Sequence, residues 1–140
     1  MSTPPRTPHR NGLLFVCVGN SGRSQIAEGF ARFIGPADMQ YFSAGSAATE
    51  LHPLAVKAMR EVGIDLSGQR IKRLSEVPIA AVATIVTLCE DEECPSLPKG
   101  VHHLSWPIED PGATPASEDE MLASFRRVRD QIRELVSRLF

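Results

Sequence analysis

The chain has 140 residues, of which 42 % are hydrophobic, and a formal net charge of −2. This length suggests one domain with enough apolar residues to form a core without covalent cross-links. The balance of charge lacks the basic excess of nucleic-acid-binding proteins, and no apolar stretch reaches the ~18 residues that a membrane span requires.

The first twelve residues contain three prolines and no apolar run. We therefore expect residues 1–12 to be a disordered tail rather than a secretory signal, and residues 13–140 to form the single domain. The three cysteines are an odd number without a signal peptide, which favours a reducing compartment, the cytoplasm. In such a compartment they are reactive or buried thiols rather than a structural framework.

Short apolar runs and amphipathic stretches alternate along the rest of the chain. Residues 13–18 predict a buried strand, and residues 23–34 predict a helix with Ile26, Phe30 and Phe33 at core spacing. We expect further strands at 39–45, 81–88 and 101–106, and further helices at 52–63 and from 117 to the C-terminus. The predicted fold class is α/β, a four-stranded parallel, doubly wound sheet with helices on both faces.

Three reactive elements fall at one edge of this predicted sheet. Ligands of open parallel sheets bind outside the carboxyl ends of the strands. Cys17 ends the first expected strand and Cys89 the third, and a polar, proline-rich loop follows the fourth. Their common position suggests a site at that edge.

The stretch "CVGNSGRS", residues 17–24, joins the first strand to the first helix. Its glycines allow a tight turn that points successive N–H groups inward, and the helix adds its unpaired N–H groups and positive dipole end. Such a loop, made of Val18, Gly19, Asn20, Ser21, Gly22 and Arg23, suits a tetrahedral oxyanion. Arg23 can hold two oxygens of the anion, and the same field favours the thiolate of Cys17. Ser24 can donate a hydrogen bond to that thiolate. The predicted chemistry is attack by sulfur on the central atom of the anion.

A packed cysteine before an ordinary turn is the alternative. A cysteine and an arginine at this spacing are common by chance. Here, however, the pair follows a strand, precedes a helix and is followed by a serine, which favours the functional interpretation.

The segment "CVGNSGRSQIAEGF" resembles the signature of the low-molecular-weight protein tyrosine phosphatase superfamily, and especially its arsenate reductase branch. The resemblance extends from about residue 13 to the end. Further landmarks match in order: "FSAG" (42–45), "VTLC" (86–89), "CP" (94–95), "DP" (110–111) and "FRRVRDQIRELV" (125–136). The fold that this resemblance implies is the sheet predicted above.

The resemblance also implies a general acid on the loop after the fourth strand. In the superfamily an Asp-Pro pair supplies it, and Asp110 is the matching residue, with Glu109 as a weaker alternative. Pro111 restrains Asp110 to extended geometry. In the phosphatase branch, aromatic residues follow this pair and contact phosphotyrosine. Here Gly112 and Ala113 follow, which favours a small inorganic anion.

For Cys89 and Cys94 the resemblance implies a disulfide relay. Cys17 attacks arsenate, Cys89 attacks the Cys17–arsenic adduct, and Cys94 moves the disulfide to Cys89–Cys94 by thiol exchange. An external dithiol protein, for which thioredoxin is the expected partner, then reduces it, and no bound cofactor is needed. Packed or incidental thiols are the alternative. Zinc is disfavoured because only His102 and His103 could complete a site.

The spacer between Cys89 and Cys94 is shorter than in better-known arsenate reductases. Its four residues are all acidic, and their charge opposes thiolate formation nearby. In a helical turn the two cysteines would lie about 7.5 Å apart along the axis, whereas a disulfide needs Cα atoms within roughly 7 Å. We therefore expect this segment to rearrange on oxidation.

Two further points stay open at the level of sequence. Asn20, Glu28 and Ser43 match positions where the family can hold a monovalent cation, with a buried polar network as the alternative. Besides arsenate reduction, the same loop fits a low-molecular-weight protein tyrosine phosphatase that forms a phospho-intermediate on Cys17. It also fits a non-catalytic anion-binding or redox-sensing module, although the combination of Cys17, Arg23 and Asp110 disfavours that.

Overall fold

The computed structural model describes residues 10–18, 22–47, 50–90, 97–113 and 115–140. Within these ranges four strands form one parallel sheet in the order β2-β1-β3-β4. The strands are β1 (Gly12–Cys17), β2 (Gln40–Gly45), β3 (Val82–Thr87) and β4 (His102–Ser105). The predicted four-stranded parallel sheet is confirmed.

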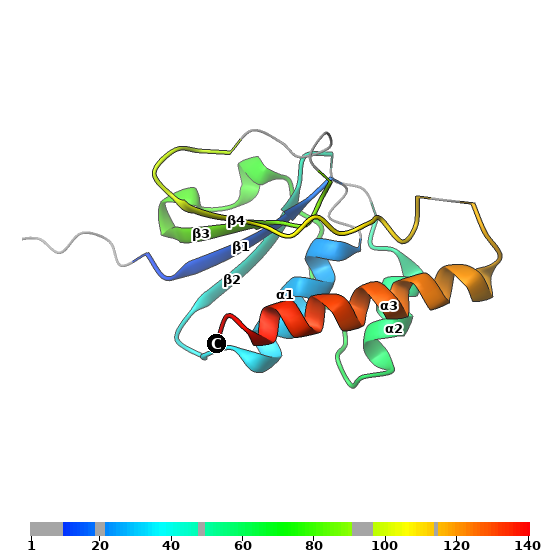
Figure 1. The fold of residues 1–140 in the computed structure, drawn as a ribbon. Coiled ribbons are helices and arrows are strands. Elements are labelled where there is room, and N and C mark those ends of the chain that lie inside the picture. Colours follow the sequence, from blue (N-terminus) through cyan, green and yellow to red (C-terminus); the bar gives the residue numbers. More distant parts are fainter. Residues whose placement is uncertain (1–9, 19–21, 48–49, 91–96, 114) are drawn as a thin grey trace, which may run out of the picture.

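One face of the sheet is covered by three α-helices (Figure 1). They are α1 (Arg23–Ile34), α2 (Pro53–Arg60) and α3 (Glu118–Ser137). Because side chains of a strand alternate between its two faces, Leu13 and Phe15 of β1 point to this side. There they join a buried cluster with Phe30 of α1 and Val128 of α3.

The opposite face of the sheet carries shorter elements. Leu14 and Val16 of β1 pack with Val77 and Ile85 in a second buried cluster. Two 3-10 helices, η1 (Leu74–Glu76) and η2 (Ile79–Ala81), cover this side, and Leu74 and Ile79 pack against the cluster. The predicted helices on both faces are therefore present, but those of the second face are single turns. Pro78 lies between them and has no N–H group with which to continue a helix.

The boundaries of the helices follow their caps. The second helix was predicted to reach residue 63, and α2 ends at Arg60. The chain then closes in a Schellman motif, in which Ile64 donates to the Met59 carbonyl and Gly63 to that of Arg60. Gly63 has a φ of 82°, a conformation that glycine adopts without strain.

The apolar stripes predicted for the helices are largely correct. Leu122, Phe125 and Val128 of α3 are buried as expected, as are Ile26 and Phe30 of α1. Phe33 is a wrong prediction, since its side chain is 73 % exposed. In this last turn of α1, Ile34 packs against the core instead.

The topology sets one place for a ligand. The chain leaves β1 toward β2 on one side, whereas β3 is followed by β4 on the other. The carboxyl ends of β1 and β3 therefore meet where the winding reverses, which is where open α/β sheets bind ligands. Cys17 is the last residue of β1.

At the N-terminal end, the first strand begins one residue earlier than the predicted domain start at residue 13. Residues 1–9 of the expected tail lie outside the described residues. Asn11 is already paired with Gln40 at the start of β2, and Gly12 belongs to β1. In the described part of the chain, no helix has the length and apolar character to cross a membrane.

Candidate active site

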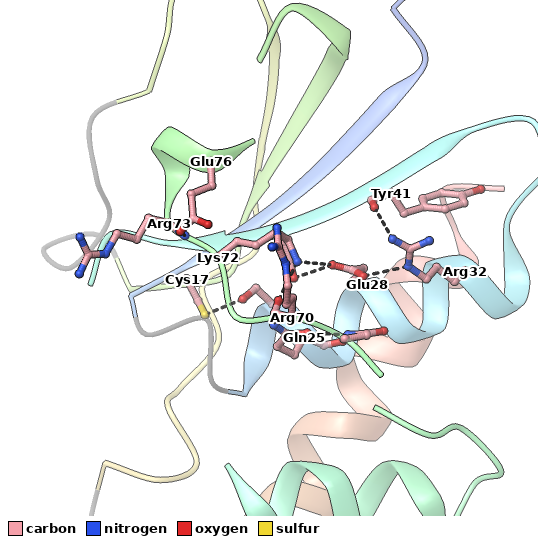
Figure 2. A network of polar contacts seen from close by, with 12 residues as sticks. Cys17, Gln25, Glu28, Arg32, Tyr41, Arg70, Lys72, Arg73 and Glu76 are labelled. Carbon is pink, nitrogen blue, oxygen red and sulfur yellow. Dashed lines mark hydrogen bonds and ion pairs between the residues drawn. The ribbon is translucent and has the colours of Figure 1, made fainter. Parts of the chain in front are cut away.

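A buried thiol marks the carboxyl end of β1. Cys17 is 2 % exposed and carries a free thiol, seen at the edge of the polar network in Figure 2. Its Sγ lies 2.9 Å from the Oγ of Ser24, which is fully buried in the first turn of α1. At this distance the hydroxyl can donate to a thiolate and so stabilise the charged sulfur. Both predicted residues are brought together.

The N-terminus of α1 follows the thiol and is left open by its own side chains. Gly22 is the N-cap and makes no side-chain cap, and the first turn contains no acidic residue. Within the described part of this helix, the first turn thus contributes no carboxylate of its own to compensate the positive end of the helix dipole. Of the predicted loop, Val18 is held by a hydrogen bond from the Ala47 N–H to its carbonyl, while Gly19, Asn20 and Ser21 lie outside the described residues.

Arg23, the first residue of α1, links three segments of the site. Its side chain is only 4 % exposed. Nη1 donates to the carbonyl of Ile108 at 2.7 Å and to that of Leu88 at 3.2 Å. The two carbonyls precede the Asp110 loop and Cys89, so one guanidinium holds both segments beside the end of the predicted anion-binding loop, residues 18–23, which we name the cradle.

The predicted general acid lies on the same side. Oδ2 of Asp110 is 3.9 Å from Nη2 of Arg23, and the carboxylate is half-exposed. Oδ1 accepts a hydrogen bond from the Gly112 N–H at 3.0 Å, which fixes the turn of the loop. Glu109 instead pairs with Arg127 of α3 at 2.9 Å, and both of these side chains are exposed. Asp110, rather than Glu109, is therefore the carboxylate that lies beside Arg23.

Cys89 lies two residues beyond β3. It is fully buried and is disulfide-bonded, whereas Cys17 is free. The Leu88 N–H donates to the Val16 carbonyl at 2.8 Å, so the pairing of β3 with β1 continues to the residue before Cys89. Cys94 and the acidic spacer from 91 to 93 lie outside the described residues, as does the rearrangement predicted for this segment.

Behind the cradle, Glu28 is the centre of a polar network (Figure 2). Its carboxylate is 2 % exposed and accepts hydrogen bonds from Ser43 at 2.6 Å and from Nε of Arg32 at 2.8 Å. Nζ of Lys72 is 3.7 Å from the same carboxylate and donates to the Arg70 carbonyl at 2.7 Å. Glu28 and Ser43, two of the residues expected to hold a monovalent cation, are thus together, and two cationic side chains already neutralise the carboxylate. Asn20, the third, lies outside the described residues.

Sequence patterns did not point to His52 as a residue of the site, because His52-Pro53 suggested only a helix start. Its Nδ1 accepts the Leu54 N–H at 3.1 Å as the N-cap of α2. Burial lowers the pKa of the imidazole, and the negative charge of Asp110 partly opposes this shift. The ring therefore lies close enough to Asp110 to interact with its charge; the loop that carries Asp110 is called the acid loop.

Comparison with known families agrees with this geometry. Residues 12–140 match the family model described as low molecular weight phosphotyrosine protein phosphatase. The chain belongs to this family. The match includes the whole sheet and all three α-helices, so the fold and the cradle described above are those of a low molecular weight phosphatase-like protein.

Relatives within the family indicate its reductase branch. The chain is 42 % identical over 122 residues to an arsenate reductase of Bacillus subtilis, covering 86 % of this chain and 88 % of the relative. It is also similar to a solved structure of an arsenate reductase in the phosphate-binding state, with a TM-score of 0.77, 33 % identity and coverage of 91 % and 95 %. A thioredoxin-dependent arsenate reductase of Corynebacterium glutamicum matches with a TM-score of 0.66 and 33 % identity, covering 91 % of this chain and 60 % of that one.

Proposed function

We propose that this protein reduces arsenate to arsenite with a thioredoxin-type dithiol as the electron donor. One observation carries the proposal. Arg23, at the end of the loop that follows Cys17, contacts both the Asp110 loop and the segment before Cys89, so all three lie at one edge of the sheet. The similarity to arsenate reductases over most of the chain supports the same chemistry.

In the first step the thiolate of Cys17 attacks arsenic(V) of the bound oxyanion. Arg23 and the N-terminus of α1 hold the anion's oxygens, and Asp110 protonates the oxygen that leaves as water. The product is a thiol–arsenate adduct on Cys17. The Ser24 hydroxyl, 2.9 Å from the sulfur, can donate a hydrogen bond to the attacking thiolate.

In the second step the thiol of Cys89 attacks the sulfur of Cys17. The electron pair of the S–As bond passes to arsenic, which leaves as arsenite, arsenic(III), while a Cys17–Cys89 disulfide forms. Cys94 then attacks Cys89, which frees Cys17 and yields Cys89–Cys94. The external dithiol reduces this disulfide and is itself oxidised.

The register of the sheet supports the reach of Cys89. Val16 pairs with Thr87. If this register continues, Leu88 lies opposite Cys17, and Cys89 lies one residue further along. Continued strand spacing separates the Cα atoms of Cys17 and Cys89 by about 6 Å, which is within the range for a disulfide. The disulfide-bonded state of Cys89 beside a free Cys17 suits the end of the relay.

Protein tyrosine phosphatase activity is the second candidate, because the same cradle and Asp110 serve phosphate. The surroundings of the acid loop favour a small anion instead. The residues directly after Pro111 are Gly112 and Ala113, which offer the ring of a phosphotyrosine no aromatic stacking surface.

We also propose that the domain from residue 13 to 140 works as one unit in the cytoplasm, where thioredoxin systems keep thiols reduced. No bound cofactor or metal is part of this proposal, since the electrons come from the external dithiol.

The test follows reductant consumption with arsenate and a thioredoxin system in the wild type and in Cys17→Ser, Cys89→Ser and Cys94→Ser. We expect arsenate-dependent turnover only in the wild type. Peptide mapping of Cys94→Ser after one turnover should detect a Cys17–Cys89 disulfide, because the step that resolves it is missing.

Hydrolysis of p-nitrophenyl phosphate by the same variants is the matched control. It should survive in Cys89→Ser and Cys94→Ser if these remain folded, and disappear in Cys17→Ser. A wild type that hydrolyses the ester but oxidises no reductant with arsenate would establish the phosphatase instead.

A further inference from the structure

The imidazole of His52 is fixed in orientation by two elements of the fold. As the N-cap of α2, its Nδ1 accepts the Leu54 N–H at 3.1 Å, so the proton of the neutral ring is carried by Nε2. One side of the ring packs on Phe125 of α3, with ring centroids 4.6 Å apart and an angle of 39° between planes. His52 can therefore neither flip its ring nor exchange its nitrogens without losing the helix cap.

The free edge of the ring faces the acid loop. A Cβ atom placed on Gly112 would be 3.4 Å from Cδ2 and 3.5 Å from Nε2 of His52, and 3.7 Å from Oδ1 of Asp110. The ring edge that carries the proton and the carboxylate oxygen thus border the same point of the loop. Gly112 is also the residue whose N–H holds Asp110.

Phe125 extends this contact to the cradle. Its side chain is 1 % exposed, and a Cβ atom on Gly22 would lie 3.5 Å from its ring. The stack of His52 on Phe125 therefore bridges Gly22, the N-cap of α1, and the acid loop.

We propose that His52 is a positioning residue that holds Asp110 at the distance from the cradle at which it can protonate the departing oxygen. Arg23 holds the loop from the sheet side through the Ile108 carbonyl, and the His52 ring lies next to Gly112 on the α2 side, where it limits how far the loop can move. The inference rests on the proposed function only in its assignment of Asp110 as the general acid.

Asparagine separates the two roles of His52. It caps helices well through its side-chain oxygen, yet it has no ring to contact Phe125 and Gly112. His52→Asn should keep the thermal midpoint of the wild type within a few degrees and lower kcat for arsenate about tenfold, while KM changes less than twofold. His52→Ala loses the cap as well and should also lower the midpoint.

A double-mutant cycle with Asp110→Asn tests whether His52 acts through the acid. Asp110→Asn alone should lower kcat about a hundredfold or more, in the range for general acid catalysis. Adding His52→Asn to Asp110→Asn should then change kcat less than twofold, because the group that His52 positions is gone. A structural role would instead lower the rate equally in both backgrounds.

The outcomes test separately whether Asp110 is the general acid and whether His52 positions it. If Asp110→Asn has no effect, the acid of the proposed function is wrong. If Asp110→Asn is slow and His52→Asn is either fully additive or without effect in the wild type, the positioning role is overturned. Should arsenate turnover be absent, the same cycle is measured with phenyl phosphate, whose phenolate is a poor leaving group and so depends on protonation by the acid.

Discussion

Ser24 Oγ lies 2.9 Å from Cys17 Sγ, and both atoms are buried where β1 meets α1. The nucleophile and its hydrogen-bond partner are separated by six residues in sequence, and the loop between them is the cradle itself. The same loop conformation therefore forms the anion-binding site and places the Ser24 hydroxyl next to the sulfur.

Replacement of Ser24 by alanine should slow the reaction of Cys17 with iodoacetamide at neutral pH by about tenfold. A hydrogen bond to a charged group contributes about 1.5–3 kcal/mol, and the attacking sulfur loses this contact when the hydroxyl is removed. The measurement uses a Cys89→Ser/Cys94→Ser background so that only Cys17 is alkylated. Ser137→Ala, at the far end of α3, is the matched control, and equal alkylation rates with and without Ser24 would exclude its role.

Replacement of Arg23 by lysine should abolish stabilisation by phosphate. An anion that binds only the folded state adds about 2.7 kcal/mol at 100 times its Kd, and lysine can neither form the two-oxygen grip nor keep the bonds to the Leu88 and Ile108 carbonyls. Thermal unfolding with and without phosphate measures the effect. Arg127→Lys, on the surface of α3, should respond like the wild type, and a phosphate response retained in Arg23→Lys would contradict the assignment.

Much of this site was predictable from local sequence. The strand, the glycine-containing loop and the amphipathic helix are adjacent in the chain, so Cys17, Arg23 and Ser24 follow from a short pattern. The family landmark at Asp110 was equally local, and the structure places that residue beside Arg23. The parallel sheet followed from the alternation of strands and helices, because parallel strands require crossovers.

The remainder depends on contacts between distant segments. The acceptors of Arg23 are backbone carbonyls 65 and 85 residues away, and a carbonyl has no sequence signature. His52 was hidden by its own capping role, since His-Pro suggests only a helix start. Nothing near Lys72 in the sequence indicates that its ammonium group lies close to Glu28. Phe33 fits the helical period, but in the last turn of α1 it is Ile34 that packs against the core.

Potassium should have no effect on the activity of the wild type. Lys72 and Arg32 already pair with the buried carboxylate of Glu28 and compensate its negative charge. The monovalent cation expected from sequence is therefore not needed as a counter-ion. Rates in potassium, sodium and choline chloride at equal ionic strength should agree. A rate that rises only with potassium would show that a monovalent cation does bind beside Glu28.

Replacement of Lys72 by methionine should lower the free energy of unfolding by about 1–3 kcal/mol, because a buried charged group loses one of its partners. It should also make that free energy rise with potassium, since the carboxylate regains a counter-charge. Denaturant unfolding in potassium and in choline chloride measures both effects. Lys99→Met, on an exposed loop, is the matched control, and a Lys72→Met protein as stable as the wild type and indifferent to potassium would show that Lys72 does not occupy this role.

The ion-pair cluster that joins α2 to α3 should make stability depend on acid pH. Arg126 and Arg129 both donate to Glu61, and these bonds lower the pKa of its carboxyl from 4.5 to about 2. A carboxyl whose pKa is lower in the folded state stabilises fully above the unfolded value and loses this contribution as pH falls toward the folded value. Glu61→Gln should therefore be less stable than the wild type at pH 7, and the difference should shrink as pH falls from about 4.5 to 2.

Denaturant unfolding at several pH values measures this difference, and added salt should reduce it because the cluster is partly exposed. Glu134→Gln removes an exposed pair with Arg138 within α3 and should change stability little at any pH, as isolated surface pairs do. A Glu61→Gln difference that stays constant through the acid window would mean that the carboxylate's charge does not hold α2 to α3.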